Sequence, residues 1–142
     1  MPRLDRDRLK GARFPVVKPI ETRFADLDVQ GHINNGAAVL ILQEARAHFH
    51  RVARLHALHE GLRVLVAGLT VEYAAEMHHP DPLEIHSGIL SIGRTSYIIG
   101  QMARQGGRDC LYAEVAVALA GPEGPAPLPA ALRESFEALR IL

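Results

Sequence analysis

The sequence predicts an α+β fold in which an antiparallel sheet of about five strands wraps around one long central helix. Two observations support it: residues 36–60 repeat apolar side chains every three or four positions, and four β-like stretches separated by short turns follow. A chain of 142 residues is long enough to bury a core without disulfides. We expect residues 13–142 to form a single domain and residues 1–12 to be a flexible or late-docking arm.

The first elements are a strand, a loop and the helix. Residues 14–25 are rich in β-forming side chains but contain Pro15 and Pro19, which suits an edge strand. Residues 26–34 form a polar loop. The helix over residues 36–60 begins with AAVLIL, which is apolar on almost all sides, so this end is expected to be buried.

The second half of the chain predicts a meander followed by a short helix. Its strands are expected at residues 64–77, 83–92, 96–104 and 110–119, because Pro, Gly and Asp occupy the breaks between them. Residues 130–142 follow a Pro- and Gly-rich segment and form a short amphipathic helix. This order requires no parallel crossover, so we expect the strands to be antiparallel.

Composition excludes several classes of function. Sixteen Lys and Arg balance sixteen Asp and Glu, without a charged run, which argues against nucleic acid as a partner. No apolar run approaches the ~18 residues of a membrane span, and the charged N-terminus lacks the apolar core of a signal peptide. We therefore expect a cytoplasmic protein with no membrane partner. Cys110, the single cysteine, is expected to be a buried, inert thiol.

The densest polar cluster is the segment R-F-A-D-L-D-V-Q-G-H-I-N-N-G before the helix. It contains Asp26 and Asp28, followed by His32, Asn34 and Asn35. Asn34 or Asn35 suits the helix N-cap, and the N–H groups of a first helical turn favour an oxyanion. A carboxylate beside such a site is typical of attack on a carbonyl, although the same residues could serve only to cap the helix and turn the loop.

A metal site is a weaker interpretation of the same residues. D-L-D-V-Q-G nearly fits a calcium loop, but Ala37 occupies the position that needs a bidentate Glu. His56 and His59 lie one helical turn apart without further ligands at a fixed spacing, and the adjacent side chains of His78 and His79 diverge. We expect neither a metal nor a cofactor.

The polar segment, followed by Q-E-A-R, resembles the hot-dog-fold acyl-CoA thioesterases of the 4-hydroxybenzoyl-CoA thioesterase type, and is also similar to acyl-carrier-protein thioesterases. The specific part is D-x-D-x-x-G-H-x-N-N. The resemblance covers roughly residues 20–133. Weaker likenesses follow in order at residues 71–73, 83–85, 92–96 and 127–129.

The resemblance implies hydrolysis of an acyl-CoA or acyl-carrier-protein thioester to a free acid and a thiol. It makes Asp28 the catalytic carboxylate, acting as a general base on water or as a nucleophile through an acyl anhydride. It also implies that the Asn35 backbone N–H polarises the thioester carbonyl, while His32 and Asn34 shape the loop or position water. A donor worth ~3 kcal/mol and a carboxylate worth ~10² to 10⁴ in rate suffice for an electrophilic thioester.

Four further positions are considered together with the resemblance. Arg94 and Ser96, in a predicted turn, are expected to bind coenzyme A, with a solvated turn as the simpler interpretation of Arg94. The family pattern N-N-x-x-Y has a tyrosine where this chain has Ala38, so we expect a wider or rerouted acyl pocket. Glu44 is either a second catalytic group or a buried carboxylate bonded to backbone.

Two other functions stay open at this point. One is a non-catalytic module that binds acyl thioesters, although Asp28 would have no use there. The other is a hot-dog hydratase or dehydratase, with Asp28 and His32 as its acid–base pair. The open strand edge of a single curved sheet and the resemblance together predict a homodimer with active sites between subunits, and pairing of dimers into tetramers.

Overall fold

The computed structural model describes residue 4 and residues 6–142, and its core is one antiparallel sheet in the order β1-β3-β4-β5-β2. A short strand, β6, pairs with β5. The predicted α+β architecture, a curled sheet packed on one long helix, is confirmed. The strands are β1 (Val16–Ile20), β2 (Arg63–Tyr73), β3 (Leu83–Ile92), β4 (Ser96–Gln105), β5 (Arg108–Gly121) and β6 (Gly124–Pro125), and the helices are α1 (Asn35–Val52), α2 (Leu55–Leu58) and α3 (Ala130–Glu137).

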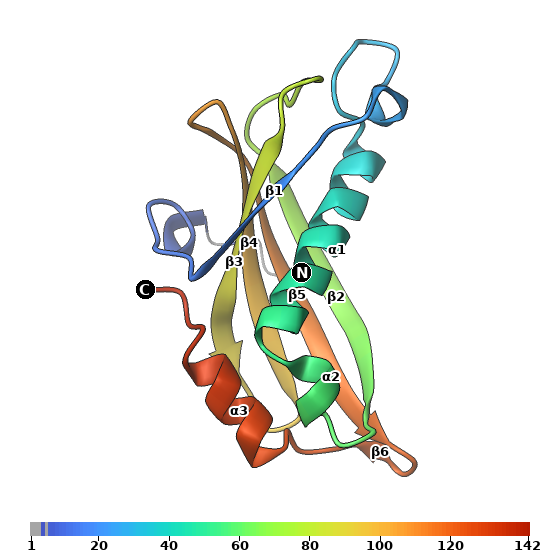
Figure 1. The fold of residues 1–142 in the computed structure, drawn as a ribbon, viewed down its shortest axis with the longest axis vertical. Coiled ribbons are helices and arrows are strands. Elements are labelled where there is room, and N and C mark those ends of the chain that lie inside the picture. Colours follow the sequence, from blue (N-terminus) through green and yellow to red (C-terminus); the bar gives the residue numbers. More distant parts are fainter. Residues whose placement is uncertain (1–3, 5) are drawn as a thin grey trace.

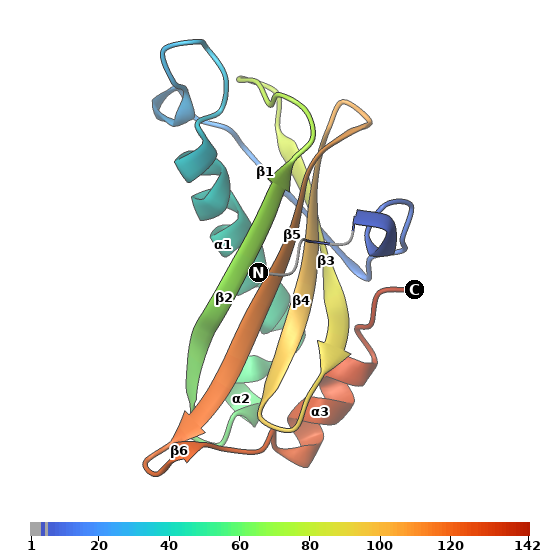
Figure 2. The same cartoon turned by 180° about the vertical axis from the view of Figure 1, so that it is seen from behind.

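The long helix α1 lies along one face of the sheet, with α2 and α3 near its far end (Figure 1). The loop that precedes α1 therefore stands at the opposite end of the molecule from α3. Figure 2 shows the other face of the sheet, which α1 leaves uncovered. None of the helices in the described residues is both long and apolar enough to cross a membrane.

The core forms between α1 and the inward side chains of the sheet. Along β5 every second residue from Leu111 to Leu119 points inward, and these side chains are at most 1% exposed. From α1, Leu42 and Phe49 pack against this layer, also with at most 1% exposure. Full burial of such a side chain contributes roughly 1.5 to 3 kcal/mol, so this layer fixes α1 on the sheet.

The predicted helix over residues 36–60 is in fact two helices. Helix α1 ends at Val52, and Arg54 adopts a left-handed conformation with φ of 60° before α2 begins. The break has a tertiary cause that local sequence does not reveal. The Ser135 hydroxyl of α3 donates to the carbonyl of Ala53 over 2.7 Å, and the turn carries Leu55 into the core.

Other element boundaries also differ from the prediction. The strand expected at residues 64–77 ends at Tyr73, because residues 74–77 leave the sheet to meet the loop before α1. The first strand covers only Val16–Ile20, since a short 3₁₀ turn at Phe24–Asp26 follows it. Helix α3 ends at Glu137, and the chain after it returns to β3, where the Ile89 N–H donates to the Leu139 carbonyl and the Ile141 N–H donates to the Ile89 carbonyl.

The N-terminal segment lies against the outer face of the sheet. Residues 6–8 form a 3₁₀ turn, and Leu9 is fully buried beside Met102 and Tyr112. The remaining residues of the predicted arm, 1–3 and 5, lie outside the described residues.

Within the described residues, one side of α1 and the β2 edge of the sheet carry exposed apolar side chains. Leu40 on α1 is 59% exposed, and Leu65 and Val66 on β2 are 46% and 55% exposed. The all-round apolar start of the helix is thus only half covered, because one curved sheet reaches one side of it. Exposed apolar patches of this kind are typical of protein–protein interfaces.

Candidate functional site

The loop between β1 and α1 is closed on itself by backbone hydrogen bonds. The Asp28 N–H donates to the carbonyl of His32 over 2.9 Å, and Leu27 and Ile33 form an isolated bridge. Gly31 turns the chain back with φ of 79°, a conformation that side chains rarely adopt. The loop therefore presents the residues between these points in a fixed arrangement.

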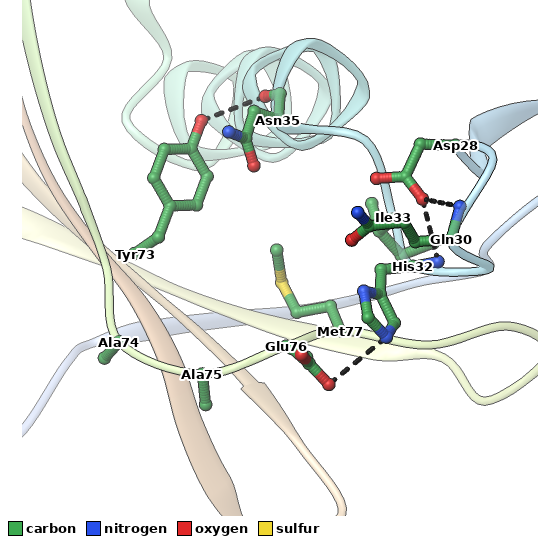
Figure 3. A pocket seen from close by; sticks show the side chains of 10 residues that line it. All are labelled: Asp28, Gln30, His32, Ile33, Asn35, Tyr73, Ala74, Ala75, Glu76 and Met77. Atoms are coloured by element: carbon green, nitrogen blue, oxygen red, sulfur yellow. Dashed lines mark hydrogen bonds and ion pairs between the residues drawn. The ribbon is translucent and has the colours of Figure 1, made fainter.

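The Asp28 carboxylate is held through one of its two oxygens. Oδ1 accepts the backbone N–H groups of Gln30 at 2.9 Å and His32 at 3.2 Å. Oδ2 has no hydrogen-bond partner among the residues that the structure describes, and Figure 3 shows it directed into the adjoining hollow. One oxygen is thus used for positioning, and the other stays available for chemistry.

The start of α1 supplies a hydrogen-bond donor to the same hollow. Asn34 is the N-cap, because its Oδ1 accepts the Gly36 N–H over 2.7 Å, so the prediction that Asn34 or Asn35 caps the helix is resolved in favour of Asn34. Within the described residues, the Asn35 N–H donates to no protein acceptor. This N–H, reinforced by the helix dipole, suits an oxyanion.

The hollow has a volume of about 410 Å³, and its opposite wall is the chain that follows β2 (Figure 3). The Tyr73 hydroxyl donates to the Asn35 carbonyl over 3.0 Å, and the Ile33 N–H donates to the Met77 carbonyl over 2.8 Å. These bonds tie the wall to the end of the loop and to the start of the helix. Sequence reasoning gave neither Tyr73 nor Glu76 a role, because a loop residue's distant partner leaves no local pattern.

Glu76 and His78, from the chain after β2, meet His32 from the loop before α1. The Nε2 of His32 lies 3.2 Å from Oε2 of Glu76, and the Nε2 of His78 lies 4.0 Å from the same oxygen. The two imidazole rings stack edge to face with centroids 5.3 Å apart. His32 therefore directs its imidazole to Glu76 and touches Asp28 only through its backbone N–H.

Asp26 has a structural environment, unlike Asp28. It is 4% exposed and accepts the Arg23 backbone N–H at 3.0 Å and its Nη2 at 2.7 Å. Hydrogen bonding and ion pairing with Arg23 hold the pKa of Asp26 below its usual range. Of these two carboxylates, Asp26 binds Arg23, and only Asp28 lines the hollow.

Four expected positions lie away from the hollow. Arg94 and Ser96 stand at the opposite end of the sheet, where Arg133 of α3 donates to the carbonyl of Gly93. Glu44 is exposed on α1, so it is not the buried carboxylate that the sequence left open.

Ala38 is 2% exposed in the core and is not among the residues that line the hollow, so a wider or rerouted acyl pocket at this position stays a prediction.

The remaining sequence expectations concern Cys110 and the histidines. Cys110 is 1% exposed, and burial raises the pKa of its thiol, as predicted for an inert side chain. Among the described residues, no group of three or more His, Cys, Asp or Glu side chains converges to hold a metal.

A family model of the thioesterase-like superfamily matches residues 22–136. A search of curated proteins gives no match. A thioesterase from Thermus thermophilus, solved with coenzyme A and Zn, is 28% identical, with a TM-score of 0.80 over 89% of this chain and 94% of that chain.

Two other solved structures are similar in fold. A predicted thioesterase from Bacillus stearothermophilus is 21% identical, with a TM-score of 0.79 over 87% of this chain and 95% of that chain. A 1,4-dihydroxy-2-naphthoyl-CoA thioesterase from Synechocystis is 15% identical, with a TM-score of 0.76 over 87% and 96% of the two chains.

Proposed function

The chain belongs to the thioesterase-like superfamily, and from this premise we propose that it hydrolyses acyl-coenzyme A thioesters to a free acid and coenzyme A. One observation carries the proposal: the open oxygen of Asp28 and the unused N–H of Asn35 border the same hollow. A carbonyl placed between them would meet an anion on one side and a donor on the other.

The chemistry follows from these two groups. The Asn35 N–H stabilises negative charge on the thioester oxygen, and Asp28 either takes a proton from an attacking water or attacks the carbonyl carbon itself. In both routes the carbon–sulfur bond breaks and coenzyme A leaves as a thiolate that solvent protonates. On the general-base route, Asp28 then releases its proton to solvent; on the nucleophilic route, water opens the acyl anhydride and restores Asp28.

His32 and Asn34 support this arrangement. The His32 N–H and the Asn34 side chain hold the loop and the helix start, which fixes Asp28 and Asn35 relative to each other. The imidazole of His32 pairs with Glu76, so Asp28 and His32 do not form the side-chain pair that a hydratase or dehydratase would need. Hydrolysis is therefore the function that this geometry favours.

We also propose that the chain works as a homodimer paired through the β2 edge, with dimers able to pair further. In the described residues, β2 pairs with β5 on one side only, and it exposes Leu65 and Val66. An open apolar edge strand of this kind can pair with the same strand of a second copy of the chain. Arg94 and Ser96 lie at the β3–β4 turn beside α3, at the opposite end of the sheet from the hollow that Asp28 lines, so a role for them in binding coenzyme A would require such a partner.

The test is release of free thiol from a panel of short, long and aromatic acyl-CoA thioesters by the purified chain and by Asp28→Asn. Turnover of at least one thioester by the wild type, lost in Asp28→Asn, supports the proposal. Binding of acyl-CoA without any turnover would instead support a non-catalytic module, and hydration of an enoyl-CoA would support the hydratase.

A further inference from the structure

A second hollow, of about 530 Å³, adjoins the candidate active site on the outer face of the sheet. Ala74 lines both hollows. It follows the end of β2, where Tyr73 turns toward α1 to bond Asn35 and Glu72 turns outward to bond Arg6. A ligand that passes the end of this strand can therefore occupy both faces at once.

The outer hollow is lined by three cations, and neighbouring acids orient two of them. Arg6 uses Nε to bind Glu72 at 3.1 Å, and Arg104 uses Nε to bind Asp109 at 2.9 Å. The terminal amino groups of both arginines make no hydrogen bond within the described part of the chain. Lys10 has no ion pair there.

This arrangement suits phosphate groups. Asp7 and Asp109 also line the hollow, so its lining carries three positive and two negative side chains. Because the acids engage Nε, they orient each guanidinium and leave its terminal nitrogens for a bidentate contact, the geometry that phosphate oxygens prefer. Lys10 adds a third positive charge to the same hollow.

We propose that this hollow binds the phosphorylated adenosine end of coenzyme A, while the pantetheine arm passes Ala74 into the hollow beside Asp28. The inference rests on the proposed hydrolysis of acyl-CoA thioesters and extends it by placing the carrier. A thioester on an acyl carrier protein lacks the adenosine end, so the site would select coenzyme A over such a protein.

The site depends on a segment that precedes the family match. The match begins at residue 22, whereas Arg6 and Lys10 lie on the N-terminal segment that Leu9 anchors to the sheet. It also differs from the expectation for Arg94, which precedes Ser96 at the end of β4 that pairs with Ala118, whereas Tyr73, next to Ala74, pairs with Leu111 at the other end of β5. Carrier recognition thus becomes a property of this chain's own N-terminal segment.

The experiment measures binding of free coenzyme A and of pantetheine, which lacks the nucleotide, to the full chain by calorimetry at low and high salt. The variants are Lys10→Ala and Arg104→Ala, singly and together. Arg8→Ala is the matched control, because Arg8 is exposed on the same segment and does not line the hollow. Lys10 is exposed and unpaired within the described residues, so Lys10→Ala should leave folding intact.

We expect each substitution to raise the Kd for coenzyme A by about tenfold at low salt and less at high salt. The Kd for pantetheine should stay unchanged, as should both values in Arg8→Ala. Equal affinity of the wild type for coenzyme A and pantetheine, or equal losses for both in Lys10→Ala, would overturn the proposal.

The same variants separate this proposal from the proposed function. If acyl-pantetheine and acyl-CoA are hydrolysed with the same KM, the proposed hydrolysis is supported and the proposed nucleotide site is contradicted. If Lys10→Ala selectively loses coenzyme A binding but the wild type hydrolyses no thioester, the proposed nucleotide site is supported and the proposed hydrolysis is contradicted. A preference for acyl carrier protein over acyl-CoA that Lys10→Ala abolishes would overturn the assignment in favour of a protein carrier.

Discussion

The imidazole of His32 and the carboxylate of Glu76 form a pair across the candidate active site, with Nε2 and Oε2 3.2 Å apart. His32 belongs to the loop before α1 and Glu76 to the chain after β2, so the pair links the two walls of the hollow (Figure 3). Because one ring nitrogen faces the acid, the other is left to meet substrate or water.

Glu76→Gln should therefore weaken catalysis without preventing folding. The amide keeps the size of the side chain but no longer favours an N–H at Nε2, so we expect kcat to fall by about fivefold, equivalent to ~1 kcal/mol. His78→Gln is the control, since His78 lies 4.0 Å from the same carboxylate. A larger effect in the control would reverse the assignment.

Asp28→Asn should separate chemistry from loop structure. Asparagine retains an Oδ1 that accepts the N–H groups of Gln30 and His32, so the loop should keep its shape. We expect kcat to fall by ~10² to 10⁴, a barrier increase of ~3 to 5 kcal/mol, with near-normal substrate affinity. Thiol release under saturating substrate measures it.

Asp26→Asn is the matched control, with the opposite expected result. Arg23 lowers the pKa of Asp26, so the pair stabilises the fold above the unfolded carboxyl pKa of about 3.9, and this contribution is lost as pH falls. We expect Asp26→Asn to lower the urea midpoint at pH 7 with little change in kcat. If turnover is lost in Asp26→Asn and kept in Asp28→Asn, the wrong carboxylate has been chosen.

Much of the fold and part of the site follow from local sequence, for reasons that particular residues show. Alternation along β5 identifies the inward residues because each side chain meets the same core. Asp28 and Asn35 were predictable because they stand in one short loop at a helix start. By contrast, the helix break at Arg54 depends on Ser135, and the role of Glu76 depends on His32. Because these partners lie far apart in the sequence, no local pattern predicts either feature.

The resemblance alone did not predict at which end of the sheet Arg94 lies. A resemblance assigns a residue to a place in the chain, but the end of the sheet at which it stands depends on strand direction. Arg94 lies in the turn before β4, and the hollow lies near the turn after it. A strand of ten residues spans about 30 Å, so one chain cannot bring them together.

His50 should make stability depend on pH. Its Nε2 lies 2.9 Å from the Tyr97 hydroxyl, and burial, with smaller effects of Arg46 and His56, lowers the pKa of His50 to about 4. Between about pH 6.5 and 4 the unfolded chain binds a proton at this histidine that the folded chain does not. The free energy of unfolding should therefore fall by about 3 kcal/mol as pH falls through this window.

Urea denaturation at several pH values from 7 to about 4 checks this effect of His50. His50→Gln should flatten the dependence, because it removes the titrating group while keeping a polar partner for Tyr97. His56→Gln, at an exposed position on α2, should leave most of the pH dependence of unfolding unchanged. An unchanged slope in His50→Gln would show that another group titrates.

The exposed edge of β2 makes the assembly testable. Leu65 and Val66 are about half exposed, and the Leu65 side chain has no covering element on this edge in the described part of the chain. Pairing of two β2 edges would bury these side chains and satisfy the open backbone groups. A charge placed there would be buried without a partner in a dimer, at a cost of about 2 kcal/mol or more.

Leu65→Glu should therefore convert the assembled protein into a monomer at micromolar concentration. Light scattering of the wild type should give a mass at least twice that of the 15.5 kDa chain, and the variant should give the mass of one chain. Leu142→Glu is the control, because Leu142 is 85% exposed at the C-terminus, away from β2. If substrate is bound between subunits, the monomer should also lose turnover. A stable wild-type monomer, or an assembled Leu65→Glu, would show that β2 is not the interface.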